Sequence, residues 1–332
     1  MKRSCILCFS LIMLLAGCVK EEYYSYNPFM AVGNAGTTYE SFSTTQLGFS
    51  TKLFVINDET GSFEQTGYGD KFIIDGYSYP QITMTYTITS VIETTVPDRG
   101  AFSVLVLIDE TLNKRNAEFA LRRLFKNLPS NCTYAIASFN PLNTGITVVG
   151  NGYTNLGDLY DQELATIFEA HNSLSGVSFD SIHLLNAIDT ALGYINANAP
   201  AGNRNLLVFT SENDFYWSEE NHDNLISRAN SYGIHCNFVD EGGGFLKSKI
   251  SSLTGGFLHY TDGSESESVL TLSKQLPALL YGGYSCYEVH WRATASVPVF
   301  THNSNKSGYI YMNLSNPDEN QQYLIPYFFY VP

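Results

Sequence analysis

The sequence predicts an α/β protein: a doubly wound, mostly parallel sheet that is inserted in or attached to an all-β sandwich. Two features of the chain support this prediction. Residues 101–281 alternate fully apolar strand-like runs with amphipathic helical runs, which is typical of a parallel sheet covered on both faces. Residues 46–100 and 284–332 instead show short runs of period two, the second segment rich in Tyr and Phe. One sandwich built from both flanking segments is therefore expected.

The flanking segments each contain three expected strands. In the first segment they lie at 51–56, 71–74 and 81–92, separated by turn residues such as Asp75-Gly76. In the second they lie at 286–293, 308–314 and 322–331. Because three strands cannot close a sandwich alone, each segment needs the other as a partner.

The central segment supplies the elements of the α/β domain at 101–281. Strands are expected at 102–108, 134–139, 146–149, 206–210, 234–239 and 257–260. Helices are expected at 117–128, 182–195, 222–232, 245–253 and 269–279. In such a sheet ligands bind at the carboxyl ends of the strands, so the residues that follow each strand are the candidate site.

The composition excludes one class of partner. The 332 residues carry 18 basic and 32 acidic side chains, a formal net charge of −14. A nucleic-acid-binding surface needs basic contacts to the phosphates, so no nucleic-acid partner is expected. A divalent cation or a basic partner suits this charge better.

The first 18 residues are predicted to be a lipoprotein signal peptide. Lys2 and Arg3 precede an apolar run at 5–16, which as a helix spans roughly 18 Å against the ~30 Å of a bilayer core. The run ends in Leu15-Ala16-Gly17-Cys18, which resembles the bacterial lipobox, so the Cys18 thiol is expected to carry the lipid. The alternative is an ordinary cleaved signal with an incidental cysteine.

The residues after Cys18 indicate where the lipoprotein goes. Lys20-Glu21-Glu22 resembles the surface-export tag of Bacteroidetes lipoproteins, and Val19 is not the Asp that marks inner-membrane retention in some bacteria. We expect an outer-membrane lipoprotein that is surface-exposed or faces the periplasm. Residues 19–45 are rich in Tyr, Ser, Thr and Gly without periodicity, and are predicted to be a flexible tether.

The first apolar strand of the central segment ends in Asp109-x-Thr111-x-Asn113. This resembles the Asp-x-Ser-x-Ser motif of von Willebrand factor A domains, which forms their metal-ion-dependent adhesion site. Residues 205–210, 231–235 and 253–257 resemble the fourth strand and two later turns of the same family. The resemblance implies a binding domain, and the oxygen at each of the three motif positions suits Mg²⁺ or Ca²⁺.

The other two metal loops depart from the family pattern. Ile182 stands where the second loop of the family has a Thr, and Asp180 or Ser181 replaces it only if the loop shifts. The third loop reads Thr210-Ser211-Glu212 in place of Thr-Asp-Gly. The acidic residues available to compensate are Glu110, Asp180, Glu212 and Asp214. The alternative is that Lys114 and Arg115 neutralise Asp109 and Glu110 without an ion.

A long acidic and aromatic loop follows the fourth strand. Phe215, Tyr216 and Trp217 stand among carboxylates between residues 211 and 224. With Glu110, these rings suit contact with a protein or glycan partner, because rings supply contact area and carboxylates supply orientation. The alternative is a solvated helix start with one ring buried.

Catalytic chemistry has no support in the sequence, so the protein is predicted not to be an enzyme. No HExxH motif and no GxSxG motif occurs, and the loop at 240–245 lacks the spacing of a phosphate-binding loop. A bridge between Cys132 and Cys236 is not expected, and of Cys132, Cys236 and Cys286 two or three are expected to be buried free thiols. The expected function is envelope binding or adhesion through the sheet edge; the alternative is a scaffold of an envelope assembly with a non-functional metal site.

Overall fold

The structure is a computed structural model that describes residues 30–57, 59–64, 71–76, 82–112, 114–140, 145–155, 160–170, 182–214, 219–261, 266–316 and 319–332. The strands are β1 Met30–Phe42, β2 Gln46–Asn57, β3 Phe72–Gly76, β4 Met84–Thr95, β5 Phe102–Asp109, β6 Thr133–Phe139, β7 Thr147–Thr154, β8 Asn203–Thr210, β9 Ile234–Asp240, β10 Leu258–Tyr260, β11 Ser285–Ala295, β12 Ser304–Asn316 and β13 Glu319–Val331. The helices are α2 Lys114–Lys126, α3 Tyr160–Ala170, α4 Ile182–Asn198, α5 Glu219–Tyr232, α6 Leu246–Thr254, α7 Ser266–Ser273 and α8 Leu276–Tyr281.

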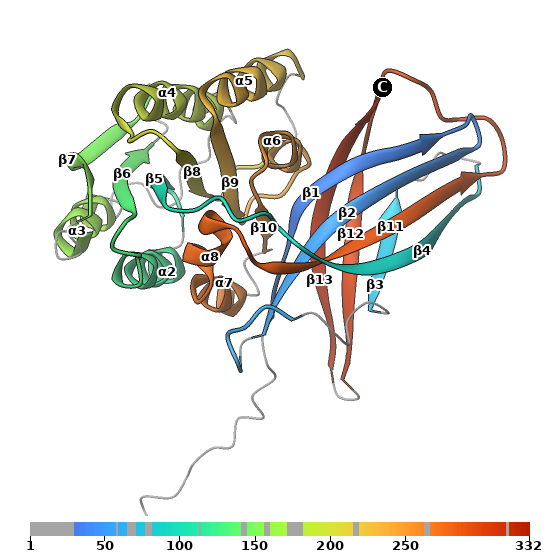
Figure 1. Cartoon of the computed structure of the whole chain (residues 1–332), viewed down its shortest axis with the longest axis horizontal. Coiled ribbons are helices and arrows are strands. Elements are labelled where there is room, and N and C mark those ends of the chain that lie inside the picture. The colour runs from blue at the N-terminus through green and yellow to red at the C-terminus, as the bar shows by residue number, and fades with distance from the viewer. Residues whose placement is uncertain are drawn as a thin grey trace, which may run out of the picture.

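One ten-stranded sheet runs through both halves of the molecule, in the order β4-β11-β2-β1-β10-β9-β8-β5-β6-β7 (Figure 1). The two halves join where β1 pairs antiparallel with β10, through the residue pairs Gly33 with His259 and Asn34 with Leu258. The backbone hydrogen bonds of the sheet therefore continue without a break from the α/β half into the sandwich half. We call this β1–β10 pairing the seam.

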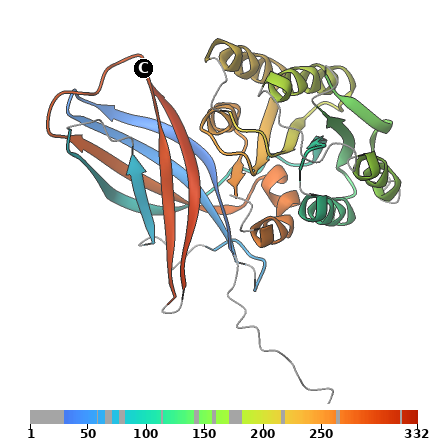
Figure 2. The same ribbon diagram turned by 180° about the vertical axis from the view of Figure 1, so that it is seen from behind.

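The α/β half has the strand order β7-β6-β5-β8-β9-β10, with β7 antiparallel to β6 and the other pairings parallel. Counted along the chain this is the order 3-2-1-4-5-6 of doubly wound sheets. Helices α2, α3, α7 and α8 contribute to the core on one face, and α4, α5 and α6 to the core on the other (Figure 2). Every residue of β5 is buried, which explains its unbroken apolar run.

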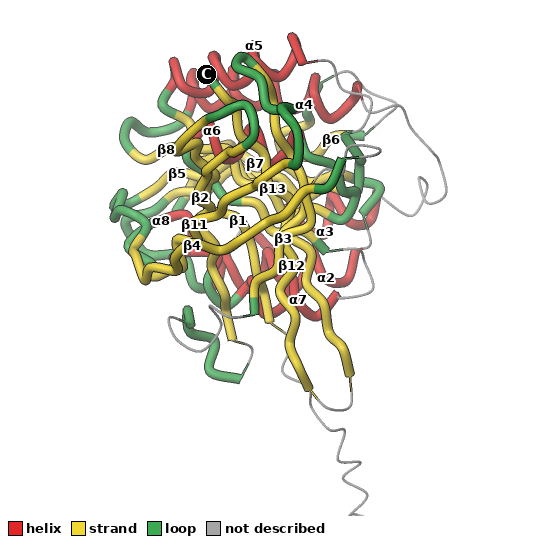
Figure 3. Tube along the Cα trace, turned by 90° about the vertical axis from the view of Figure 1, so that its right-hand side faces the viewer, coloured by secondary structure: helices red, strands yellow, loops and turns green. Residues whose placement is uncertain are grey.

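The sandwich half packs β4, β11, β2 and β1 against a second sheet of order β13-β12-β3. β11 pairs with both β2 and β4, and β12 pairs with β3, so strands from before and after the α/β half share both sheets. Aromatic rings fill the core: the ring of Phe49 stacks on those of Trp291, Tyr327 and Phe329. Figure 3 shows β12 and β13 as a long paired ribbon beside the shorter β3. The predicted fold class is confirmed.

The expected tether at 19–45 is wrong for its second part, because Met30–Phe42 forms β1. The first five residues of β1 are buried, since the strand pairs with β2 and β10 and is covered by other elements, so it lacks the alternation of a half-exposed strand. Cys18 and residues 19–29 lie outside the described residues. Within the described part of the chain, no helix has the length and hydropathy needed to cross a membrane.

Two helices also differ from expectation. Helix α3 was not among the expected elements, and the single helix expected at 269–279 is divided into α7 and α8. Pro277 lies in the first turn of α8, where its missing N–H costs no helical hydrogen bond. A proline there marks a helix start, so one continuous helix was the wrong interpretation of the apolar pattern.

Candidate functional site

The candidate site lies where β5, β8 and β9 end side by side. Asp109 ends β5, Thr210 ends β8 and Asp240 ends β9. The parallel register pairs Ile108 with Phe209, and Thr210 with Asp240, so the three ends meet at one edge of the sheet. Chain segments 100 residues apart are thereby brought together, as the sequence predicted for this fold class.

Asp109 is the centre of the site, and it is 1% exposed. One carboxylate oxygen, Oδ1, accepts hydrogen bonds from the backbone N–H of Thr111 at 2.8 Å and from its hydroxyl at 2.6 Å. The other, Oδ2, accepts from the Thr210 hydroxyl and the Ser211 N–H, both at 3.1 Å. The carboxylate is thus held by donors from two loops, which fixes its orientation.

The hydroxyls of Thr111 and Ser211 lie 3.2 Å apart, within hydrogen-bonding distance. The Ser211 hydroxyl also lies 3.4 Å from Asp109 Oδ2. Both side chains are part-buried, so they reach the surface of the molecule beside the enclosed carboxylate. Two hydroxyl oxygens and one carboxylate therefore converge from the first and third predicted metal loops.

Glu212 brings a second carboxylate to this edge. Its Oε2 accepts a hydrogen bond from the Leu184 N–H, in the first turn of α4, at 3.3 Å. Its Oε1 is buried and has no hydrogen-bond partner among the described residues. Burial, and then the nearby negative charge of Asp109, raise the pKa of Glu212 to about 7. A helix N-terminus thus stabilises one oxygen of this carboxylate and leaves the other available.

Asp214 does not join Asp109; it caps another helix. Its Oδ2 accepts hydrogen bonds from the N–H groups of Leu246 and Lys247 at 2.7 and 2.8 Å, at the start of α6. The side chain is 1% exposed. Gly244, at φ 109°, gives this carboxylate room, because a Cβ at that position would overlap it. The loop at 240–245 is therefore a turn built around Asp214.

Glu110 is turned away from a partner surface. Its two carboxylate oxygens accept hydrogen bonds from the Ser138 hydroxyl at 2.6 Å and from the Asn140 amide at 3.0 Å. The residue is only 8% exposed. Its expected role as a partner-binding residue stays a prediction; in this arrangement both oxygens bond to Ser138 of β6 and to Asn140 after it.

Lys247 is the charged residue that the sequence analysis missed. Its ammonium group is fully buried, pairs with the Asp240 carboxylate and donates to the backbone carbonyl of Glu212. The available signal was the acidic end of β9 followed, after one turn, by a lysine in a short helix. That signal is weak, because a lysine in the first turn of a helix is usually solvated.

Several predicted residues lie outside the described residues: Asn113, Asp180, Ser181, Phe215, Tyr216 and Trp217. The side chains of Lys114 and Arg115, the expected neutralising cations, lie outside them too. The structure brings together Asp109, Thr111, Ser211 and Glu212 from the predicted set. It separates Asp214 and Glu110 from that group.

The donor chemistry of this group fits a hard divalent cation. All its side-chain donors are oxygens, as Mg²⁺ and Ca²⁺ prefer, and one of them, Glu212 Oε1, is buried without a partner. Within the described part of the chain, no cluster of three or more His, Cys, Asp or Glu side chains has metal-binding geometry. The oxygens that converge here belong to two carboxylates and to the hydroxyls of Thr111 and Ser211.

Neither a protein-family model nor a curated protein matches the chain. Solved structures do resemble it. The chain is similar in fold to von Willebrand factor A domains. A von Willebrand factor type A protein from Catenulispora acidiphila is 9% identical over 90% of this chain and 73% of that one, with a TM-score of 0.40.

Two further solved structures are similar to the chain. The ArnB paralog VWA2 from Sulfolobus acidocaldarius is 9% identical over 91% of this chain and 74% of that one, with a TM-score of 0.36. Manganese-loaded TRAP protein from Plasmodium vivax is 12% identical over 74% of this chain and 97% of that one, also with a TM-score of 0.36. Likenesses this weak transfer no ligand or partner to this chain.

Proposed function

We propose that this protein is a non-catalytic binding module that engages a protein or glycan partner at the edge formed by Asp109, Thr111, Ser211 and Glu212. The observation that carries the proposal is the convergence of these oxygens from the ends of β5 and β8. Burying a carboxylate beside two part-buried hydroxyls costs desolvation free energy. A ligand that binds these oxygens would explain why the fold keeps them together.

A divalent cation, Mg²⁺ or Ca²⁺, is part of this proposal. Such an ion supplies a positive centre to which an acidic group of the partner binds. Asp109 would hold it, with Thr111 and Ser211 contributing hydroxyl oxygens and Glu212 the unpaired Oε1. The competing version has no ion, and a basic group of the partner pairs with Asp109 and Glu212 directly.

Calorimetric titration tests the ion. Mg²⁺, Ca²⁺ and Mn²⁺ are titrated separately into the metal-free protein, into Thr111→Val and into Ser211→Ala. Thr166→Val is the matched control, because its hydroxyl is exposed and donates within α3 to the Gln162 carbonyl. We expect saturable heat for the wild type and the control, and loss of at least about tenfold in affinity for each site variant. An absence of heat at millimolar metal would exclude the version with an ion and would favour the version in which a basic group of the partner binds directly.

Partner capture tests the function itself. The purified protein is immobilised and exposed to an envelope extract with and without chelator, alongside Thr111→Val and Thr166→Val. Capture that is lost in Thr111→Val alone supports the site, and its loss with chelator supports the ion. Equal capture by all three proteins contradicts the proposed edge.

The second candidate function, a scaffold in an envelope assembly, is favoured by apolar side chains on the outside of the sandwich. Ile73 is 51% exposed and Ile92 is 49% exposed, and β4 is an edge strand with β11 as its partner in the sheet. An edge strand of this kind offers unpaired backbone groups to another chain. Ile92→Lys should then abolish assembly, whereas Thr111→Val should not.

We also propose that the module is a lipoprotein of the outer membrane, attached through Cys18. The lipobox at residues 15–18 supports this address. Metabolic labelling of the bacterial host with an alkyne fatty acid is the test: the wild type should be labelled and Cys18→Ser should not. Labelling of both proteins would refute attachment at Cys18.

A further inference from the structure

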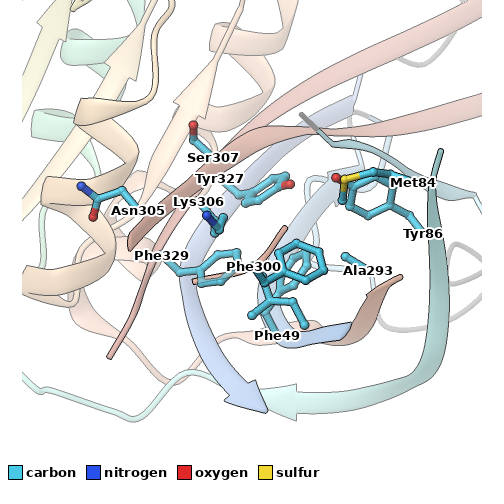
Figure 4. Close-up of a pocket in the computed structure, with 11 residues that line it drawn as sticks. Phe49, Met84, Tyr86, Ala293, Phe300, Asn305, Lys306, Ser307, Tyr327 and Phe329 are labelled. Atoms are coloured by element: carbon cyan, nitrogen blue, oxygen red, sulfur yellow. The ribbon is translucent and has the colours of Figure 1, made fainter. Parts of the chain in front are cut away.

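A cavity opens between the two sheets of the sandwich, in the half of the molecule that does not carry Asp109 (Figure 4). Its volume is about 300 Å³. Most of its wall is apolar, with Leu47 and Phe49 from β2 facing Tyr327 and Phe329 from β13. A concave, mostly apolar site with a few polar groups is the usual form of a small-molecule site.

The walls of the cavity are rigid. Phe49 stacks on Tyr327 with ring centroids 5.3 Å apart and on Phe329 at 4.7 Å. Gly308 pairs with Tyr327 across the strands, and a Cβ on Gly308 would overlap the Tyr327 ring. The glycine therefore lets this ring lie flat over β12. Stacked rings held in this way form a preformed surface for an apolar ligand.

One cation, Lys306, lines this space beside the polar side chains of Asn305 and Ser307. Ile310 and Met312 of β12 are fully buried in the sandwich core. Because alternate residues of a strand point to the same face, Lys306 lies on the inner face with Ile310 and Met312. In the part of the chain that the structure describes, no carboxylate pairs with Lys306. Partial burial accordingly lowers its pKa.

An inward-facing lysine beside stacked rings has a cost that a ligand can offset. Partial desolvation penalises the ammonium group, and a bound anion returns a charge-assisted hydrogen bond. A bound cation would meet like charge, and a neutral chain would leave the ammonium group unpaired. Charge complementarity therefore selects an anionic amphiphile.

We propose that this cavity binds a small amphiphilic carboxylate, with its carboxylate on Lys306 and its apolar body against Phe49, Tyr327 and Phe329. At about 300 Å³ the cavity lies at the small end of the range of small-molecule pockets, which favours a small ligand. A medium-chain fatty acid has this size and this distribution of charge. The assignment is independent of the Asp109 edge, because the two sites share no residue.

The test compares three ligands of equal chain length: decanoate, decanol and decylamine, each below its micelle concentration. Binding is measured by calorimetry and by tryptophan fluorescence in a Trp217→Phe background. In that background Trp291 is the remaining tryptophan, and its ring stacks at 6.5 Å on Phe49, a wall of the cavity. We expect one decanoate per chain, bound at least about tenfold more tightly than decanol, and no detectable decylamine.

Lys306→Met separates the ammonium group from its aliphatic stem, because methionine keeps a similar apolar chain. This variant should bind decanoate and decanol equally, and should retain the decanol affinity of the wild type. The exposed Lys126→Met is the matched control and should keep the preference for decanoate. Ala293→Leu, which fills the cavity from β11, should lose both ligands.

Three outcomes would overturn the proposal. They are equal affinity of the wild type for decanoate and decanol, a preference for decanoate that survives in Lys306→Met, and no binding of any of the three ligands. Near-ultraviolet circular dichroism establishes that each variant is folded. If Ala293→Leu does not fold, the comparison of Lys306→Met with Lys126→Met still shows whether Lys306 selects the carboxylate.

Discussion

The ammonium group of Lys247 forms an ion pair with the carboxylate of Asp240, and neither side chain is exposed to solvent. Lys247 also donates to the backbone carbonyl of Glu212, so one buried cation connects the end of β9 to the loop after β8. Asp214 caps the helix that carries Lys247. The candidate site therefore rests on an internal charge network directly beneath it.

Lys247→Met should destabilise the protein by about 3–5 kcal/mol, because it leaves Asp240 buried without its partner. Lys247→Met combined with Asp240→Asn should recover part of this loss, since no unpaired charge remains. The measurement is the free energy of unfolding in urea.

The exposed pair of Arg228 and Asp189 is the matched control, with side chains 44% and 47% exposed. Arg228→Met should cost no more than about 1 kcal/mol, because solvent screens an exposed pair. Equal losses of unfolding free energy in Lys247→Met and Arg228→Met would mean that burial does not raise the cost of breaking the Lys247–Asp240 pair.

Asp109→Ala should cost about 2–4 kcal/mol of stability, independently of any ligand. The substitution removes the acceptor of two backbone N–H groups and three hydroxyls, from Thr111, Thr210 and Ser211. Asp109→Asn keeps one acceptor oxygen and should cost less. Urea unfolding of both variants measures the difference, and a wild-type stability for Asp109→Ala would show that these hydrogen bonds do not matter to the fold.

The central sheet and the candidate edge could be predicted from the sequence, because the strand signals are local and the fold class brings the strand ends together. The apolar run of β5 stops at Asp109, and a fully buried parallel strand must end where its apolar run ends. The register of β5 with β8 then places Ser211 beside Asp109. The first step needs only the local sequence, whereas the second needs the parallel pairing of two strands about 100 residues apart, which the fold class supplies.

The seam and the charge network could not be predicted, because long-range packing determines both. β1 is ordered through pairing with β10, more than 220 residues away, and its own residues show no period. Lys247 and Lys249 resemble a solvated helical turn in the sequence, yet both are buried. Asp240 and Asp223 pair with them, and the ring of Phe328 covers Lys249.

Gly33→Ala should destabilise the seam by about 2–3 kcal/mol. A Cβ at Gly33 would overlap the ring of Phe54 and the backbone carbonyl of Leu258, and the carbonyl cannot move without disturbing β10. Gly193→Ala is the matched control, because a Cβ there meets open space on α4. This control should stabilise the protein by about 0.5–1 kcal/mol. Thermal unfolding of both variants measures these changes. Wild-type stability for Gly33→Ala would contradict the close packing at the seam.

The three thiols of the folded part should not react in the native protein. Cys132, Cys236 and Cys286 are free and buried, and burial raises the pKa of Cys236 to about 12 and that of Cys286 to about 11. Because the thiolate is the reactive form, a thiol-specific reagent at pH 8 should label none of them until denaturant is added. Mass spectrometry before and after denaturation counts the labels, and native labelling of Cys236 would show that β9 opens.

The stability of the seam should depend on pH through His259. This imidazole is 1% exposed, and its Nδ1 and Nε2 lie 2.9 Å from the Val32 carbonyl and 3.2 Å from the Ser268 hydroxyl. Burial lowers its pKa to about 4. The unfolded chain therefore takes up a proton near pH 6.5 and the folded chain only near pH 4, so the stabilisation from neutral His259 is complete above pH 6.5 and declines as the pH falls toward 4.

The decline amounts to about 3 kcal/mol across this window, at about 1.4 kcal/mol for each unit of pKa. Buried Asp240 contributes in the opposite sense, because burial raises its pKa to about 6 and so favours the folded state at low pH. Glu212, with its pKa raised to about 7, acts in the same sense as Asp240. The total slope therefore mixes several groups, and the difference between wild type and His259→Asn isolates the histidine. Urea unfolding at pH 7 and pH 4.5 should show a smaller loss in His259→Asn, whereas the exposed His302→Asn should match the wild type. Equal losses in all three proteins would exclude His259 as the source, because the imidazole would then be protonated to the same extent in the folded and unfolded chains.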